Sequence, residues 1–193
     1  MPGNNDSVSA DSLSNNRESL RRVFWLLPVI FVIHDGEELL TMPAWIESHQ
    51  PELDELARLN ETAAQMIRSM PTTTAEVAVA IGVFLLLFVV VTAGASLSRG
   101  RGFWLYAYAV LLGVLFLHVF SHIAQAFFIG GYVPGLVGAA MIVLPAALYI
   151  YKKLFDAKLL TFKAAVITAL TGLALFVPGA ALAHQIGRMF GKN

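Results

Sequence analysis

The sequence predicts an all-α integral membrane protein, a bundle of about five transmembrane helices with one amphipathic surface helix. The composition is the first observation behind this prediction: 57% of the 193 residues are hydrophobic and 13% are charged, whereas a soluble domain has about 25% charged residues. The mean hydropathy is +0.68. The second is a series of five long apolar segments, and the third is a polar stretch between the first two that carries leucines at helical spacing.

The five apolar segments cover residues 23–46, 75–97, 103–129, 134–151 and 161–185. Each approaches or exceeds the roughly 20 residues that an α-helix needs to cross the hydrocarbon core. The first segment contains several ionisable residues, so its assignment as a spanning helix depends on its length and flanks. The segments predict a single membrane-embedded domain over residues 21–193.

Two polar regions flank the first of these helices. Residues 1–20 are rich in asparagine and serine, which predicts a disordered N-terminal tail. Residues 51–70 have Leu53, Leu56 and Leu59 on one helical face, with Pro51 at a favourable start and Pro71 beyond the end. This pattern predicts an amphipathic helix at the membrane surface.

Composition also excludes several classes of function. The formal net charge is zero, and the lack of a basic patch with interleaved aromatics argues against nucleic-acid binding. Cysteine is absent, so disulfides and thiolate metal sites are excluded, and histidine, aspartate and glutamate remain as metal ligands. The expected surroundings are the lipid bilayer of a bacterial or archaeal cell, and the oligomeric state is left open.

The distribution of cations predicts an orientation, because cytoplasmic loops carry an excess of lysine and arginine. With the N-terminus in the cytoplasm and the C-terminus outside, nine of the 13 cations are cytoplasmic. They are Arg17, Arg21, Arg22, Arg99, Arg101, Lys152, Lys153, Lys158 and Lys163.

The most informative feature is the run His34-Asp35-Gly36-Glu37-Glu38 inside the first apolar helix. A charged residue at the centre of a membrane helix costs roughly 2.5–3.5 kcal/mol on translocon scales, so such residues need partners and indicate a functional site. His34, Glu37 and Glu38 are three or four residues apart and share a helix face.

A second set of ionisable residues lies in the third apolar helix. His118 and His122 are one turn apart, the spacing of a two-histidine metal platform. At 1.5 Å per residue, both helices carry their ionisable residues in the outer half of the bilayer. Glu76 begins the second helix on the same side, where it is either a further ligand or part of a capping box that starts at Thr73.

These residues predict a metal site made of His34, Glu37, Glu38, His118, His122 and Glu76. The candidate catalytic residues are Glu38 and Glu37, with Glu38 as a bridging ligand or a general acid/base. Mixed imidazole and carboxylate ligation suits iron or zinc, and the number of candidate ligands favours either two ions or one ion with a free catalytic glutamate. His184, near the end of the fifth helix, is left open as a further ligand.

The motif at residues 34–38, followed by Trp45, the pair His118 and His122, and a Tyr-x-Pro-Gly turn over residues 132–135, resembles the HXXEE family of small membrane proteins. The resemblance extends from the first to the fourth apolar helix. It implies an enzyme-like site on His34, Glu37 and Glu38 and does not supply a substrate.

The leading hypothesis is a metal-dependent membrane enzyme that acts on a lipophilic small molecule. Its reaction class is oxidation, as in hydroxylation or desaturation, or hydrolysis by a zinc-activated water. The second hypothesis is a metal-free isomerase or cyclase of a lipid or terpenoid substrate that uses Glu37 or Glu38 as the acid. The third is a metal-ion transporter or sensor, which is less favoured because the inner half of the bundle lacks ionisable residues. The site is expected to open to the outer leaflet, beneath the amphipathic segment 51–70.

Overall fold

The protein is an all-helical bundle in the computed structural model, which describes residues 5–61, 64, 65, 67 and 73–190. Its elements are α1 (Asn5–Ser48), α2 (Gln50–Leu59), α4 (Thr74–Leu97), α5 (Gly102–Ile129), α6 (Leu136–Gly138), the π-helical turn η1 (Ala139–Val143), α7 (Leu144–Asp156) and α8 (Phe162–Phe190). The segments α6, η1 and α7 follow one another without a break.

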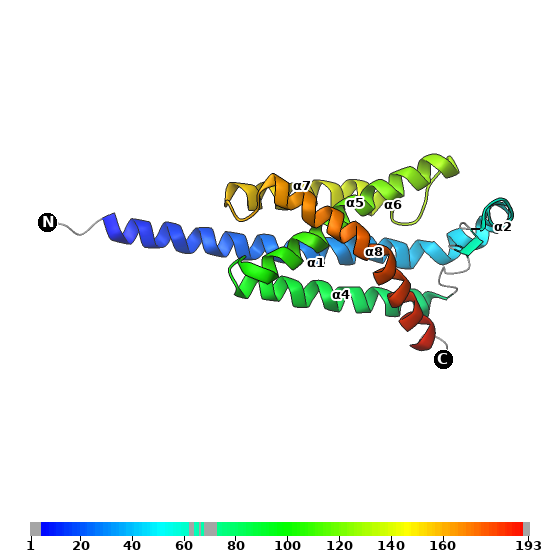
Figure 1. Ribbon diagram of the computed structural model, residues 1–193, viewed down its shortest axis with the longest axis horizontal. Helices are drawn as coiled ribbons and strands as arrows, with labels where there is room; N and C mark the ends of the chain where they lie inside the picture. The colour runs from blue at the N-terminus through cyan, green and yellow to red at the C-terminus, as the bar shows by residue number, and fades with distance from the viewer. Residues whose placement is uncertain (1–4, 62–63, 66, 68–72, 191–193) are drawn as a thin grey trace.

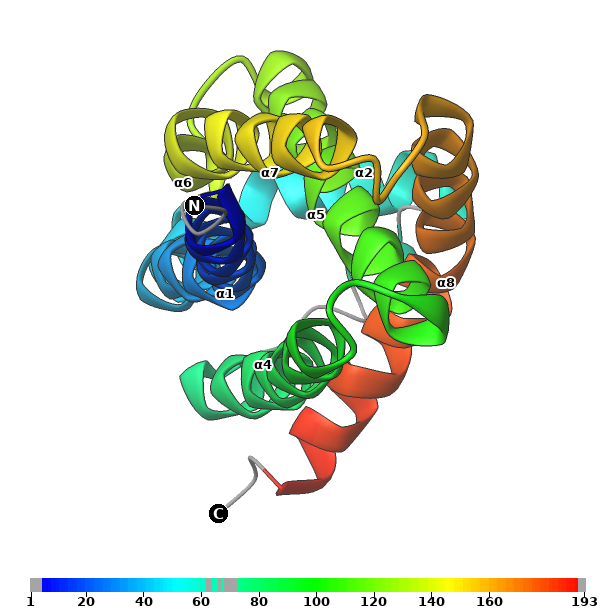
Figure 2. The same cartoon turned by 90° about the vertical axis from the view of Figure 1, so that its left-hand side faces the viewer.

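The long elements of the bundle are α1, α4, α5, the continuous α6–η1–α7 segment and α8, each of which we call a rod. Successive rods alternate in direction along the molecule, and α5 and α8 cross it obliquely (Figure 1). The rod α1 packs against α4 on one side and against η1 and α7 on the other, and α8 packs against both α5 and α4. Viewed from one end, the rods are arranged around a common centre (Figure 2). The N-terminus and the C-terminus lie at opposite ends.

Within the described residues, four helical segments are long and apolar enough to cross a membrane: Thr74–Leu97, Gly102–Ile129, Leu136–Asp156 and Phe162–Gly187. Their bounds agree with the predicted segments to within a few residues. They support an integral membrane protein. The remaining predicted span, residues 23–46, lies within α1 but is not among these four.

Aromatic packing joins α1 to the rest of the bundle. Phe31 stacks on Phe88 of α4 with ring centroids 4.4 Å apart, and Phe24 contacts Tyr108 of α5 edge to face. The Tyr108 hydroxyl donates a hydrogen bond of 3.2 Å to the backbone carbonyl of Phe24. These contacts bury the middle of α1, so α1 belongs to the core of the bundle.

The N-terminal region departs from the sequence-based expectation. Residues 1–20 were expected to be disordered, but α1 begins at Asn5, and residues 1–4 lie outside the described part. The physical reason is helix propagation: residues 5–20 contain no proline or glycine, and extending an existing helix costs far less than nucleating one. In consequence α1 projects well beyond the other rods (Figure 1).

The first half of the predicted surface helix is present as α2, which ends at Leu59 because the backbone of Asn60 is extended, with φ −148° and ψ 118°. The prediction of one continuous helix over residues 51–70 is therefore wrong at Asn60. Pro51 lies in the first turn of α2, Leu53 is buried, and Leu56 and Leu59 are exposed. The expected continuation to Met70 falls partly outside the described residues. The helix lies across the end of the bundle opposite the N-terminus, behind the rods in Figure 2.

Candidate metal centre

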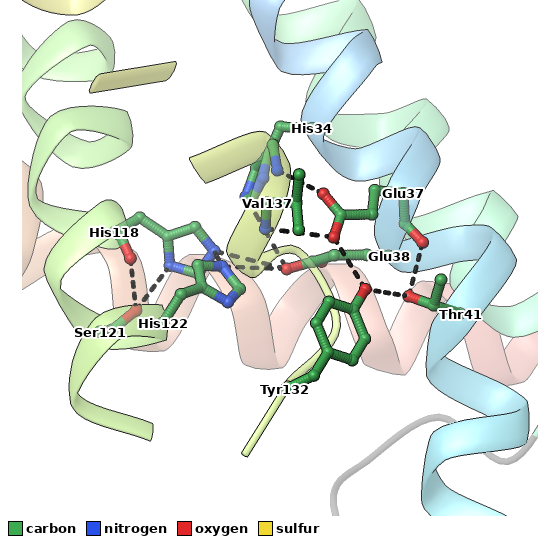
Figure 3. Close-up of polar contacts among 10 residues, drawn as sticks. His34, Glu37, Glu38, Thr41, His118, Ser121, His122, Tyr132 and Val137 are labelled. Atoms are coloured by element: carbon green, nitrogen blue, oxygen red, sulfur yellow. Dashed lines mark hydrogen bonds and ion pairs between the residues drawn. The ribbon is translucent and has the colours of Figure 1, made fainter. Parts of the chain in front are cut away.

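Two helices bring four predicted ligands together in the interior of the bundle. His34 and Glu38 are one turn apart on α1, and His118 and His122 are one turn apart on α5 (Figure 3). One potential ligand atom from each residue lies within 4.8 Å of those of the other three. His34 and His122 are buried, whereas the side chains of Glu38 and His118 are 15% and 21% exposed.

The Glu38 carboxylate occupies the middle of this group. Its Oε1 atom lies 3.8 Å from His34 Nε2, 3.7 Å from His118 Nε2 and 3.2 Å from His122 Nε2. The Nε2 atoms of His118 and His122 are 2.9 Å apart. Four ligands at about 2.0–2.1 Å from a tetrahedral metal ion are about 3.3 Å from one another. The three distances from Glu38 and the His118–His122 distance, 2.9–3.8 Å, bracket that value, and all four ligand atoms lie within 4.8 Å of one another.

Several of the imidazole nitrogens lack protein partners. Both ring nitrogens of His34, and Nδ1 of His122, are buried without a hydrogen bond to any described residue. Burial of an unpaired polar group is costly, and most buried polar groups in proteins have a partner. A cation bound among the four residues would satisfy His34 Nε2, the unpartnered nitrogen that lies 3.8 Å from Glu38 Oε1. This supports a metal as the missing partner of that nitrogen.

Ser121 orients one of the ligands. Its hydroxyl donates to the backbone carbonyl of His118 at 2.7 Å, and its oxygen lies 3.1 Å from His118 Nδ1. Because the hydroxyl proton is used on the carbonyl, the oxygen accepts a hydrogen bond from Nδ1–H. The lone pair of Nε2 is then directed at Glu38, which is the tautomer that a metal requires.

Glu37 points away from the group, toward the start of the α6–η1–α7 rod (Figure 3). Its carboxylate accepts hydrogen bonds from the Tyr132 hydroxyl at 2.7 Å and from the backbone N–H groups of Val137 and Gly138 at 3.3 and 2.5 Å. The first N–H groups of a helix have no partner within the helix, and the helix dipole favours a negative charge there. Glu37 of α1 therefore caps another helix, 100 residues further along the chain.

The capped rod fits tightly against the cluster because two of its residues lack side chains. A Cβ atom on Gly135 would lie 2.7 Å from His122 Cε1 and 2.8 Å from Glu38 Oε1. One on Gly138 would lie 2.8 Å from Glu37 Oε2. Gly135 also has a φ of +82°, a conformation that favours glycine.

Further hydrogen bonds fasten the turn before α6 to the end of α1. The Trp45 indole N–H donates to the Tyr132 carbonyl at 2.8 Å, and the Tyr132 hydroxyl lies 3.3 Å from Thr41 Oγ1. Partial burial raises the pKa of Tyr132, and its hydrogen bond to Glu37 also raises it. The phenol therefore stays protonated as a donor to Glu37 at neutral pH. We refer to residues 132–138 as the strap.

The other predicted ligands lie elsewhere. Glu76 is buried in the first turn of α4, where its backbone N–H donates to Thr73 Oγ1 at 3.2 Å. This confirms the cap at Thr73. The backbone carbonyl of Glu76 lies against Gly187 of α8. Neither Glu37 nor Glu76 belongs to the group of four, and the side chain of His184 is outside the described part of the structure.

The sequence was compared with models of known protein families, with curated proteins and with solved structures. A family model described as "Protein of unknown function with HXXEE motif" matches residues 25–150, which is more than half of the chain. No curated protein and no solved structure shows significant similarity to the chain. The matched residues include the four clustered side chains, Glu37 and the strap.

Replacement of Ser121 by alanine is expected to lower metal affinity roughly 10–100-fold, the usual effect of losing a partner that orients a ligand. Chelator competition on the purified protein measures the change. The matched control is Ser121→Thr, which keeps the hydroxyl and is expected to keep most of the affinity. Equal affinity in the alanine variant and the wild type would contradict the orienting role.

Replacement of Glu37 by alanine is expected to lower the thermal unfolding midpoint in detergent, because several hydrogen bonds to a charged group, each worth about 1.5–3 kcal/mol, are lost. Metal stoichiometry at saturating metal is expected to be retained, whereas Glu38→Ala loses it. Glu37→Gln keeps an acceptor for the α6 N–H groups and should recover part of the stability. A Glu37→Ala variant as metal-free as Glu38→Ala would instead identify Glu37 as a ligand.

Proposed function

We propose that this chain, which belongs to the HXXEE family, is a membrane enzyme that uses one transition-metal ion to transform a lipophilic small molecule. The observation that carries the proposal is the convergence of three imidazoles and one carboxylate from α1 and α5 on a common point. Such a group inside an apolar bundle is expensive unless it is paired, and intramembrane ionisable groups mark functional sites.

The donor set fits one ion better than two. Of the two adjacent motif glutamates, Glu38 faces the imidazoles, whereas the Glu37 carboxylate already accepts three hydrogen bonds from the strap. The remaining four ligands are His34, Glu38, His118 and His122. Imidazole and carboxylate suit iron and zinc. Four protein ligands fill a tetrahedral zinc site, whereas an iron ion with five or six ligands keeps positions for substrate, so we favour iron.

The residues of the chain have distinct roles in this proposal. His34, His118, His122 and Glu38 would hold the ion, Ser121 orients His118, and Glu38 is the one carboxylate of the group that could accept a proton. A bound iron ion would supply oxidising chemistry with O₂, and a bound zinc ion would supply an activated water for hydrolysis. The strap shields the site with the backbone of Gly135 and Gly138.

The apolar surroundings of His118, which with Glu38 is partly exposed, favour a lipophilic substrate. His118 packs against Phe176 of α8 with ring centroids 5.2 Å apart, and Phe120 and Ile123, which flank the site on α5, are exposed to the bilayer in this proposal. We further propose that α1 is the fifth spanning helix, with α5 supplying partners for Glu38 and the strap supplying partners for Glu37. The N-terminus is then cytoplasmic, and α2 lies across the outer end.

Metal analysis of the purified protein is expected to find about one equivalent of iron or zinc. His34→Ala, His118→Ala and His122→Ala should each lose most of it, because each variant removes one of the four protein ligands that the proposal assigns to the ion. The matched control is His49→Ala: His49 stacks on Trp45 with ring centroids 4.3 Å apart and is not part of the group. Full metal retention by His118→Ala would overturn the assignment and favour metal-free acid/base chemistry.

The reaction class is tested by comparing lipid extracts of cells that express the wild type or His122→Ala. Oxidation is expected to give products that differ by one added oxygen atom or two lost hydrogen atoms, detected by mass spectrometry. Products of cleavage by water would support the zinc hydrolase instead. Identical extracts, with wild-type protein loaded with metal, would contradict an enzyme acting on membrane lipids.

A further inference from the structure

The end of the bundle opposite the metal centre carries a concentration of positive charge. This end holds the α4–α5 and α7–α8 turns and the projecting part of α1 (Figure 1). Within residues 18–190 its cations are Arg21, Arg22, Arg99, Arg101, Lys152, Lys153, Lys158 and Lys163. At this end, Glu18 and Asp156 are the acidic residues within the same range, and each forms an ion pair on its own helix. Glu18 pairs with Arg22 at 2.5 Å, and Asp156 pairs with Lys152 at 2.7 Å.

A cavity of about 430 Å³ opens at this end, between α1 and α7. Its volume is within the range of small-molecule sites. It is lined by Glu18, Ser19, Arg22, Val23, Leu26 and Tyr149. The Lys153 ammonium lies over the Tyr149 ring, 5.5 Å from its centroid, which places a second cation beside the lining. We refer to this cavity as the basic slot.

The basic slot straddles the boundary between polar and apolar sequence on both helices. On α1 the charged residues end at Arg22, and the apolar run starts at Val23. On α7 the apolar run ends at Tyr151, and charged residues start at Lys152. The polar and apolar halves of the lining therefore lie at the level where headgroups meet acyl chains. An amphiphile satisfies both halves, whereas a soluble anion satisfies only the polar one.

We propose that the basic slot binds an anionic glycerophospholipid, with its glycerol-phosphate headgroup on Arg22 and Lys153. Arginine carries five N–H donors, so Arg22 can hold a phosphate while one donor stays on Glu18, and its side chain is 80% exposed. Ser19 adds a hydroxyl donor. The Glu18 carboxylate accepts a hydrogen bond from a headgroup hydroxyl, and Leu26 contacts the start of an acyl chain. Basic pockets between transmembrane helices bind anionic headgroups in this way.

The charge bias of the whole end favours an anionic lipid over a zwitterionic one. It also raises a competing explanation, because an excess of cations on one side of a membrane protein can serve orientation alone. Orientation requires cations anywhere at this end, whereas the proposed site requires the two beside the slot. Removing Arg22 and Lys153 therefore distinguishes lipid binding in the slot from a role in orientation, and the comparison does not depend on the metal centre.

The test uses the full-length protein in phosphatidylcholine nanodiscs, with phosphatidylglycerol added as the probe. Native mass spectrometry after mild detergent extraction counts the lipid that stays bound. Wild type is expected to retain phosphatidylglycerol in preference to phosphatidylcholine. The double variant Arg22→Ala with Lys153→Ala is expected to lose roughly thirtyfold in affinity, about fivefold for each cation.

The matched control is Arg101→Ala with Lys163→Ala, which removes the same charge from the same end but away from the slot. It is expected to retain the lipid, and Arg22→Lys is expected to restore binding to a folded protein if alanine at this position impairs folding. Equal losses in the slot and control variants, or equal retention of phosphatidylcholine by wild type, would overturn the proposal. Thermal stabilisation by glycerol 3-phosphate as large as that by the lipid would also overturn it in favour of a soluble anion.

Discussion

Hydrocarbon cannot solvate charge, so His34, Glu37 and Glu38 in the apolar part of α1 need partners inside the protein. This requirement determines how the bundle is assembled around residues 34–38. His34 and Glu38 are directed at α5, where His118 and His122 complete the group. Glu37 is directed at the exposed N–H groups of the rod that begins at α6. The three elements are therefore held by polar contacts as well as by packing, and loss of any one of them leaves buried polar groups of the other two without partners.

The buried polar group on α1 and α5 also restricts the strap, where two glycines lie against it. The turn of the strap brings the backbone, and no side chain, against the cluster at Gly135 and Gly138. The π-helical turn that follows, Ala139–Val143, contacts both α1 and α5, and such turns are frequent at functional sites. Hydrogen bonds of Trp45 and Tyr132 hold the turn of the strap against α1.

Much of this arrangement could be predicted from the sequence, because hydropathy and helical spacing are local. The bounds of α4, α5 and α8, the cap at Thr73 and the meeting of the two helical pairs follow from such patterns. The different roles of the two glutamates, Glu38 beside the imidazoles and Glu37 on the N–H groups of α6, could not be predicted from the sequence. Both side chains are close to His34 on the helix surface. Their roles are decided by the start of α6, about 100 residues away, and no spacing within the motif encodes that contact. The helical state of residues 5–20 depends on the continuation of α1, which composition does not reveal.

The position of the ligands on rigid rods has a consequence for the chemistry that we propose. Of the rods, α1 and α5 each contribute two ligands one turn apart. The geometry of the site therefore depends on the distance between these two helices more than on any loop. Sites built on helices hold their geometry better than sites built on loops. The Glu37 cap and the strap tie the start of the α6–η1–α7 rod to α1, close to the C-terminal end of α5, and so restrain that distance. The two partly exposed ligands, Glu38 and His118, are then the ones that a substrate reaches, while His34 and His122 stay buried behind them. A lipid tail entering beside Phe176 would therefore meet His118 first, and the Glu38 carboxylate, 3.7 Å from His118 Nε2, would be the nearest group able to accept a proton.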